Sequence, residues 1–316
     1  MKLAKVIQTY VTFKRSMGMH FHSEDCLLRA FCRAVGSVKV DISDVKPASV
    51  QAFLDGKGPI TAVWGLKFRV LRSFYRFTIS RGFATNSPLP TSLPQLPPPF
   101  VPYIYSTGEL RRLLAATDVL EAPESPLQAP TVRTLLLLLY GTAMRIGEAL
   151  SLTLHDADLT QAVVTVRNTK FFKARLVPIG PKLTHELSIY EARRRQLPLP
   201  HGDDSAFFAT RTGHRFPYQR AITLFQRVRR QAGIQREAGA SYPPRLHDIR
   251  HTSATHRLIA WYQAGADVQK LLPQLATYLG HADISSTQLY LSMTPELLRE
   301  ASTRFEQYAK PEMRDE

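Results

Sequence analysis

The chain has few cysteines and no long hydrophobic run, and each absence excludes a class of protein. It contains 316 residues but only two cysteines, Cys26 and Cys32. Two thiols cannot form a disulfide framework or a four-thiolate zinc site, so we expect both to be reduced core residues of a cytosolic protein. The longest apolar run, Leu135–Tyr140, is far shorter than the ~20 residues of a membrane-spanning helix. The N-terminus also lacks the apolar core of a secretion signal.

Acidic residues are scarce as well. The 26 Asp and Glu residues face 41 Lys and Arg residues, which gives a formal net charge of +15. Such an excess favours a polyanionic partner, because cationic side chains that bind phosphates release condensed counterions. Charge alone also fits a merely basic soluble protein. A membrane surface is less favoured, since no long basic amphipathic helix is present.

One segment is rich in proline and marks a domain boundary. Residues 88–102 contain seven prolines, which prevents helix or inner strand. We therefore expect a helical domain over residues 1–87, a linker over 88–102 and a second domain over 103–316. Residues 1–100 carry 14 basic and 5 acidic residues, and residues 101–316 carry 27 and 21, so the first segment is the more basic per residue.

Apolar spacing predicts helices near residues 6–13, 26–35 and 63–79 in the first domain. The third of these carries four basic residues, which are either a solvated face or contacts to a DNA backbone. These four candidate DNA-binding residues are Lys67, Arg69, Arg72 and Arg76.

The second domain is predicted to be mainly α with a small antiparallel β-sheet. Strands are expected at 162–166 and 175–179, joined by a polar turn. The predicted helices span residues 108–116, 130–140, a restart near 145, and 181–196, 217–232, 247–263, 284–292 and 295–308.

Four short clusters in this domain hold residues that can carry chemistry. They are TAMRIGEAL around Arg145, RNTKFFKARLVPI around Lys170, HDIRH at His247–His251 and LGHADISSTQLY at Leu279–Tyr290. Each cluster alone has an ordinary surface or packing explanation. Together they provide two arginines that can bind phosphate oxygens, lysine and histidine that can move protons, and a tyrosine that can be a nucleophile. This set suits phosphoryl transfer to tyrosine with no metal and no cofactor.

Two metal-dependent alternatives fit the sequence less well. His247 and His251 have a spacing that can bind zinc, but the segment lacks the glutamate of the HExxH motif and Arg250 would repel a cation. Metal-dependent transposition of the DDE type needs spaced carboxylates on a strand-rich core. No such arrangement is seen among Asp156, Asp158, Asp203 and Asp204.

On these motifs, residues ~103–310 resemble the tyrosine recombinases of the phage integrase family. Arg145 in GTAMRIGEALSL matches the family's first catalytic arginine, and His247 with Arg250 matches its His-x-x-Arg box. Leu279-Gly280-His281 matches the third box, and Tyr290 follows His281 at the usual nine-residue spacing. Lys170 matches the lysine of the β-hairpin. The sequence NTKFFKARLVPI resembles the corresponding segment of integrases carried by transposons or plasmids.

The resemblance implies a role for each matched residue. Tyr290 is implied to attack the scissile phosphate and form a 3′-phosphotyrosyl link, while Arg145 and Arg250 hold the non-bridging oxygens. Lys170 is implied to protonate the departing 5′ oxygen. His247 is implied to take or orient the tyrosine proton, and His281 to donate a hydrogen bond to the phosphate.

Several placements stay open at this point. Lys173 competes with Lys170 for the role of general acid; otherwise Lys173 and Arg175 are candidate DNA-binding residues. Glu148 either orients Arg145 or is an exposed helix residue. The stretch from Gly265 to His281 is about four residues longer than the common pattern, and its Pro273 is expected to break a helix.

The function implied is site-specific recombination of double-stranded DNA through a four-way junction. The expected assembly is a homotetramer on two duplexes, with or without partner recombinases. The helix near 295–308 either packs on its own domain or docks on the next protomer. A bacterial cytoplasmic, nucleoid-associated location follows from the DNA substrate. The alternatives are a DNA-relaxing enzyme of the type IB topoisomerase kind, and a silent DNA-binding protein of the same fold.

Overall fold

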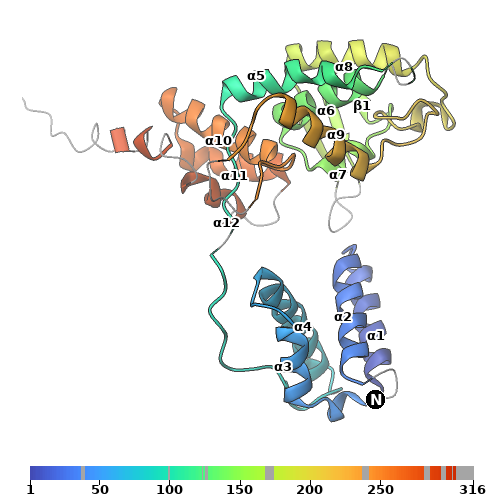
Figure 1. Ribbon diagram of the computed structural model, residues 1–316, viewed down its shortest axis with the longest axis vertical. Coiled ribbons are helices and arrows are strands. Elements are labelled where there is room, and N and C mark those ends of the chain that lie inside the picture. Colours follow the sequence, from blue (N-terminus) through green and yellow to red (C-terminus); the bar gives the residue numbers. More distant parts are fainter. Residues whose placement is uncertain are drawn as a thin grey trace, which may run out of the picture. The chain divides into compact units, whose positions relative to one another are not determined.

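The chain divides into two units near residue 100, as a computed structural model shows (Figure 1). The first unit is Met1–Phe100 and the second begins at Val101. The described part of the proline-rich segment 88–102 contains no helix or strand. The structure describes residues 1–36, 40–98, 100–122, 124, 127–167, 174–236, 242–280, 285–292, 297–300 and 302–303.

The first unit is helical, as its apolar spacing predicts. Its α-helices are α1 (Leu3–Ser16), α2 (His22–Ala34), α3 (Pro47–Asp55) and α4 (Ala62–Ser80), with a 3-10 turn η1 (Ile42–Asp44) before α3. Helices α1, α2 and α4 confirm predictions from the sequence. Helix α3 was not predicted, because it is short and buries only Val50 and Leu54.

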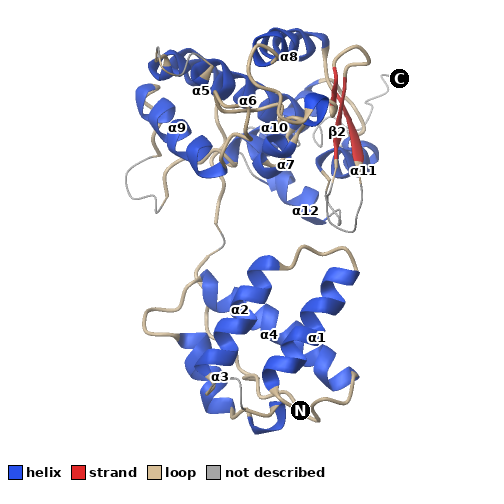
Figure 2. Cartoon of the chain, turned by 90° about the vertical axis from the view of Figure 1, so that its right-hand side faces the viewer, coloured by secondary structure: helices blue, strands red, loops and turns tan. Residues whose placement is uncertain are grey.

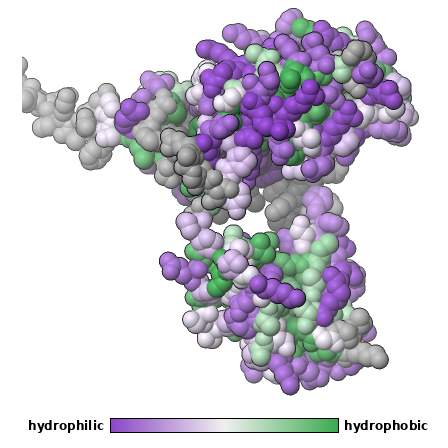
Figure 3. All heavy atoms as spheres, in the orientation of Figure 1, coloured by the Kyte–Doolittle hydropathy of each residue, from purple (hydrophilic) through white to green (hydrophobic). Residues whose placement is uncertain are grey.

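The core of this unit is aromatic and lies between α1, α2 and α4. Tyr10 of α1 packs against Phe74 of α4, with ring centroids 5.5 Å apart, and Phe31 of α2 is fully buried. Cys32 lies in this core, whereas Cys26 is exposed, which corrects the expectation that both thiols are buried. The surface mixes hydrophilic and hydrophobic areas (Figure 3).

The second unit adds a small sheet to a set of helices. Strands β1 (Ala157–Asp158), β2 (Val163–Val166) and β3 (Arg175–Pro178) are antiparallel in the order β1-β2-β3. The register pairs Val164 with Val177 and Val166 with Arg175. This sheet, red in Figure 2, confirms the predicted fold class; only the two-residue strand β1 was not predicted.

The helices of the second unit largely follow the predicted ranges (Figure 1). They are α5 (Thr107–Ala115), α6 (Gln128–Thr142), α7 (Ile146–Ser151), α8 (Pro181–Arg194), α9 (Tyr218–Gln231), α10 (Asp248–Gln263), α11 (Val268–Leu279) and α12 (Ser285–Gln288), with 3-10 turns η2 (Ala116–Leu120), η4 (Gly202–Asp204) and η5 (Leu289–Ser292).

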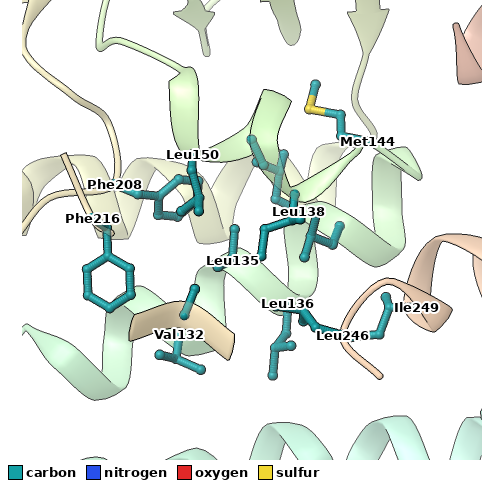
Figure 4. Packing of buried hydrophobic residues seen from close by; sticks show 14 of the residues in the cluster. Val132, Leu135, Leu136, Leu138, Met144, Leu150, Phe208, Phe216, Leu246 and Ile249 are labelled. Atoms are coloured by element: carbon teal, nitrogen blue, oxygen red, sulfur yellow. The ribbon is translucent and has the colours of Figure 1, made fainter. Parts of the chain in front are cut away.

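Helix α6 is the centre of this unit. Its apolar run is buried on several sides, with Leu135, Leu136 and Leu138 inside a large hydrophobic cluster (Figure 4). Helices α8 and α10 and the turn η2 pack around it. A helix that is apolar on several faces belongs in a domain core when it is this short. Within the described residues, no helix is both long and apolar enough to cross a membrane.

Helix α11 corrects the expectation of a break at Pro273. The helix runs from Val268 to Leu279 with Pro273 inside it. The Asp267 side chain caps its start by accepting a hydrogen bond from the Lys270 amide at 3.2 Å. A proline at this position removes one hydrogen bond to the carbonyl of Gln269, and Gln269 is exposed, so water can satisfy that carbonyl. The longer segment after Gly265 therefore forms a regular helix through Pro273.

A buried arginine holds together the loops that follow α8. Arg194 has no exposed surface, and its guanidinium donates to the carbonyls of Ala206 (2.9 Å), Pro198 (3.2 Å) and Gly213 (3.3 Å). Gly213 has φ +81°, and an added Cβ would lie 2.2 Å from the Pro198 oxygen. One side chain thus donates to three carbonyls of irregular backbone.

We expect Arg194→Met to lower the free energy of unfolding of the second unit by about 3 kcal/mol, because a buried charged donor to three carbonyls is lost. Chemical unfolding of the full chain, followed by circular dichroism, measures the change. The neighbouring Arg193 is exposed, so Arg193→Met is the matched control. Equal stability of the two variants would contradict this role for Arg194.

Candidate active site

The His-x-x-Arg segment is held in place by a buried tyrosine and a buried aspartate. Tyr105 donates from its hydroxyl to the Arg245 carbonyl at 3.0 Å, and its amide donates to Thr252 Oγ1 at 3.0 Å. Asp248 is fully buried and accepts from the Arg245 amide at 2.8 Å and from its guanidinium at 2.8 Å. These contacts fix the first turn of α10, from which His247, Arg250 and His251 project.

Arg250 is a buried cation that joins three helices. Only 3% of the residue is exposed, and its guanidinium donates to the carbonyls of Ala143 (2.5 Å) and Leu279 (2.8 Å) at the ends of α6 and α11. Burial, and then the charge of Arg145, lower the pKa of Arg250 to about 10, so it stays protonated at neutral pH. Ala143 adopts φ +51°, a left-handed conformation uncommon for residues other than glycine. Backbone strain of this kind is typical of functional sites.

Arg145 lies at the start of α7 and is partly exposed. Its Nη1 donates to Glu148 Oε1 at 2.9 Å and its backbone amide to Glu148 Oε2 at 3.0 Å. Its Nη2 donates to the Gly280 carbonyl at 3.3 Å. The guanidinium is therefore oriented by α7 on one side and by the end of α11 on the other.

Glu148 is the carboxylate of this cluster. It is largely buried and also binds both terminal nitrogens of Arg175, at 2.8 and 3.2 Å. Burial raises the pKa of Glu148, but hydrogen bonds and charge from Arg175, and then from Arg145, outweigh it and lower the pKa to about 2. Of the two possibilities for Glu148, the contacts support orientation of Arg145 rather than an exposed helix position.

Tyr290 is buried beside Arg250. It is 2% exposed and packs in an apolar cluster with Ala143, Leu258 and Leu279. Burial raises its pKa, and the charge and hydrogen bond of Arg250, with the charge of Arg145, offset part of that increase. The phenol is therefore neutral at physiological pH and close to two cations that can stabilise its ionised form.

Two histidines, His247 and His251, flank these groups. His247 was expected to take or orient the Tyr290 proton, but His251 is in ring contact with Tyr290. The His251 ring lies 5.6 Å from that of Tyr290 and 5.2 Å from that of His247. Burial, and then His247, lower the pKa of His251 to about 4, so its ring is neutral at pH 7. Desolvation, and then Arg250, also lower the pKa of His247, although much of its side chain reaches solvent. The sequence offered one signal for His251, its position next to Arg250.

The structure thus brings four predicted catalytic residues together: Arg145, His247, Arg250 and Tyr290. The other two, Lys170 and His281, lie outside the described residues, as does Lys173. Among the described residues, no group of three potential metal-ligating side chains converges, and the pair His247 and His251 has no third partner of that kind.

The predicted DNA-binding residues differ in their surroundings. Arg69, Arg72 and Arg76 are exposed along one side of α4, at spacings of three and four residues. Lys67 instead donates to the carbonyls of Phe53 (2.6 Å) and Leu54 (3.3 Å) at the end of α3. Arg175 is bound to Glu148. Lys67 and Arg175 thus have partners within the protein, Lys67 at a partly buried position, and their contact with DNA stays a prediction.

Comparison with known proteins identifies relatives over most of the chain. The sequence profile described as the phage integrase family matches residues 107–296. The y4rE protein of Sinorhizobium fredii, whose name proposes an integrase or recombinase, is 35% identical over 305 residues, which cover 96% of this chain and 95% of that protein. The tyrosine recombinase XerD of Pseudomonas aeruginosa is 33% identical over 235 residues, covering 74% and 72%.

Solved structures show the same fold. The integrase of the transposon Tn1549, in complex with a circular intermediate DNA, superposes with a TM-score of 0.69 at 17% identity and covers 98% of this chain and all of that one. A lambda integrase dimer bound to a core site superposes with a TM-score of 0.65 at 16% identity and covers 93% and 97%.

The low pKa of His251 predicts loss of stability in acid. The unfolded chain binds a proton at His251 near pH 6.5, whereas the folded chain resists it down to about pH 4. Stability is therefore present above about pH 6.5 and decreases as the pH falls toward 4. Protonation of His251 is expected to lower the free energy of unfolding by up to ~2 kcal/mol between pH 7.5 and pH 5.

Thermal unfolding of the full chain at these two pH values tests this expectation. His251→Gln should reduce the acid-induced decrease in Tm, and His185→Gln, at an exposed position of α8, should not. A wild-type pH dependence in His251→Gln would show that His251 is not the group responsible.

Proposed function

We infer that this chain, which belongs to the phage integrase family, is a site-specific DNA recombinase that breaks and rejoins DNA through a tyrosine. One observation carries the assignment of the nucleophile. The buried Tyr290 phenol lies beside the Arg250 guanidinium, and the charges of Arg250 and Arg145 lower the pKa that burial of the phenol raises. A phenol in this position has its developing negative charge stabilised as it attacks a phosphate.

We propose that Tyr290 Oη attacks the scissile phosphorus of one DNA strand. The bond from phosphorus to the 5′ oxygen breaks, the phenol loses its proton, and the departing oxygen gains one. The product is a 3′-phosphotyrosyl link with a free 5′ hydroxyl. Because the link conserves the energy of the phosphodiester, attack by a 5′ hydroxyl of a partner duplex rejoins the strands without ATP.

The arginines suit the charge that develops in this step. Arg145 and Arg250 are held by backbone carbonyls and a carboxylate, so their positions are set before DNA arrives. Pre-positioned cations stabilise a phosphorane-like transition state without reorganisation at the moment of reaction. This role does not require a metal ion.

We assign proton transfer to the histidines and the hairpin lysine. His247 and His251 both have lowered pKa values, so each ring is neutral and able to accept a proton or a hydrogen bond at pH 7. Ring contact with Tyr290 makes His251 a further candidate to orient the phenol. Lys170 remains the proposed donor to the 5′ oxygen, with Lys173 as its alternative, and His281 the proposed donor to the phosphate.

We further propose that the protein acts as the integrase of a mobile element. The solved relatives with the same fold include a transposon integrase and a phage integrase, each bound to DNA. On this proposal residues 1–87 are a DNA core-binding domain, four protomers hold two duplexes, and the enzyme works on the bacterial nucleoid. The exposed arginine row of α4, which consists of Arg69, Arg72 and Arg76, supports contact between the first unit and the DNA backbone.

The nucleophile is tested with a DNA duplex that carries a nick near the cleavage site and traps the covalent intermediate. We expect the wild type to give a protein–DNA adduct resistant to SDS and Tyr290→Phe to give none, because phenylalanine has no nucleophilic oxygen. Tyr218→Phe, at an exposed position of α9, should retain the adduct.

The same assay separates the alternatives. DNA binding without an adduct in the wild type would favour a silent DNA-binding protein. An adduct without exchange between two labelled sites would favour a DNA-relaxing enzyme.

The arginine row of α4 is tested by the salt dependence of DNA binding. We expect Arg72→Ala and Arg76→Ala each to weaken binding to any duplex and to lower the slope of log K against log salt by about 1, since one phosphate contact is lost. Fluorescence anisotropy over a range of KCl concentrations measures the slope. Lys67→Met should lower stability and leave the slope unchanged, because Lys67 binds the end of α3; a lower slope in Lys67→Met would contradict this distinction.

A further inference from the structure

The Arg175 side chain is largely buried and paired with Glu148, whereas a residue that binds the DNA backbone would be exposed. Arg175 begins β3, and its side chain is 12% exposed. Nη1 and Nη2 bind the two oxygens of Glu148 at 3.2 and 2.8 Å, a fork-to-fork geometry. With its terminal nitrogens directed into the protein, Arg175 has little capacity left to bind a DNA phosphate.

The same guanidinium lies against the backbone at the end of α11. A Cβ added to Gly280 would lie 2.7 Å from Arg175 Nη1 and 2.9 Å from its Cζ. Gly280 also has φ +68°, so glycine is required both by the backbone and by Arg175. Gly280 in turn accepts the hydrogen bond from Arg145 Nη2. Arg175 therefore contacts both groups that hold the Arg145 side chain, Glu148 and Gly280.

The electrostatics explain why two arginines are needed on one carboxylate. Glu148 accepts two hydrogen bonds from Arg145, one from its side chain and one from its amide, and two from Arg175. Without Arg175, each carboxylate oxygen would lose a donor. Arg145 is the nearest remaining cation, and it would turn both of its terminal nitrogens toward Glu148 and away from a bound phosphate.

We propose that Arg175 is a positioning residue of the recombination reaction. It saturates Glu148 and supports Gly280, so that Arg145 keeps donors directed at the scissile phosphate. This inference rests on the proposed function, in which Arg145 binds a non-bridging oxygen of that phosphate. It differs from a DNA-binding role because Arg175 acts through Arg145 and touches no DNA. It differs from a purely structural ion pair because its effect depends on the charge of the phosphate.

The test compares Arg175→Met and wild type on two nicked duplexes. One carries the natural scissile phosphate, and the other carries a methylphosphonate there, in which a neutral methyl group replaces one charged oxygen. We expect Arg175→Met to form the adduct roughly 10- to 100-fold more slowly on phosphate, because Arg145 is misplaced rather than removed. On methylphosphonate the defect should shrink to a few-fold, since less negative charge requires stabilisation.

Three further substitutions make the result specific. Arg145→Met should show the same dependence on the substrate. In Glu148→Gln, addition of Arg175→Met should cause less loss than it does in the wild type, because the second change acts through a carboxylate that is already gone. Arg175→Lys keeps the charge but can fill only one carboxylate oxygen, so an intermediate rate is expected; this variant carries the test if Arg175→Met does not fold.

Equal loss on both substrates would overturn the proposal in favour of a general structural role. The salt dependence of DNA binding, measured in a Tyr290→Phe background, is a second test of the role of Arg175 that does not require DNA cleavage. An unchanged slope in Arg175→Met supports the positioning role, and a slope lower by about 1 identifies a DNA contact and overturns it. Failure of the proposed function has a separate signature, the absence of an adduct in the wild type on phosphate.

Discussion

The buried Arg250 guanidinium is the contact on which the rest of the site depends. It comes from α10 and binds the carbonyls that end α6 and α11, at Ala143 and Leu279. Helix ends leave carbonyls without partners, and a buried cation with several donors satisfies two of them at once. The apolar cluster that contains Tyr290 forms beside this junction. Arg250 therefore both joins the ends of α6 and α11 to α10 and lies beside the proposed nucleophile, Tyr290.

The charge balance of the site is unfavourable until an anion binds. Arg145, Arg175 and Arg250 lie close together around the carboxylate of Glu148. The nearby buried carboxylate of Asp248 is bound by a further arginine, Arg245. The lowered pKa of Arg250 and the lowered pKa values of both histidines express this positive potential together with burial. A phosphate that enters such a site relieves repulsion and gains several charge-assisted hydrogen bonds. The same physical condition thus favours binding of DNA and stabilises the charge that develops during cleavage.

Much of the fold was accessible from local patterns. The helices that became α1, α2, α4, α8, α9 and α10 and the strands β2 and β3 follow apolar spacing, because one face of each is buried. Helix α3 escaped prediction because it is short, and α11 because Pro273 suggested a break. A proline removes only one hydrogen bond, and an exposed turn of helix tolerates that loss when the capped start and the buried face of the helix stabilise the rest.

The sequence by itself determined the chemistry: two arginines, histidines and a tyrosine in a recognisable order, with an excess of basic residues to meet DNA. The tertiary structure decided which of these side chains meet. Arg175 and Lys67 looked like free cations, but their partners Glu148 and Phe53 lie 27 and 14 residues away. Arg145 and Gly280 meet across 135 residues, and His251 contacts the Tyr290 ring. Spacing along the chain reports only neighbours on the same helix or strand, whereas these contacts are set by how separate elements pack.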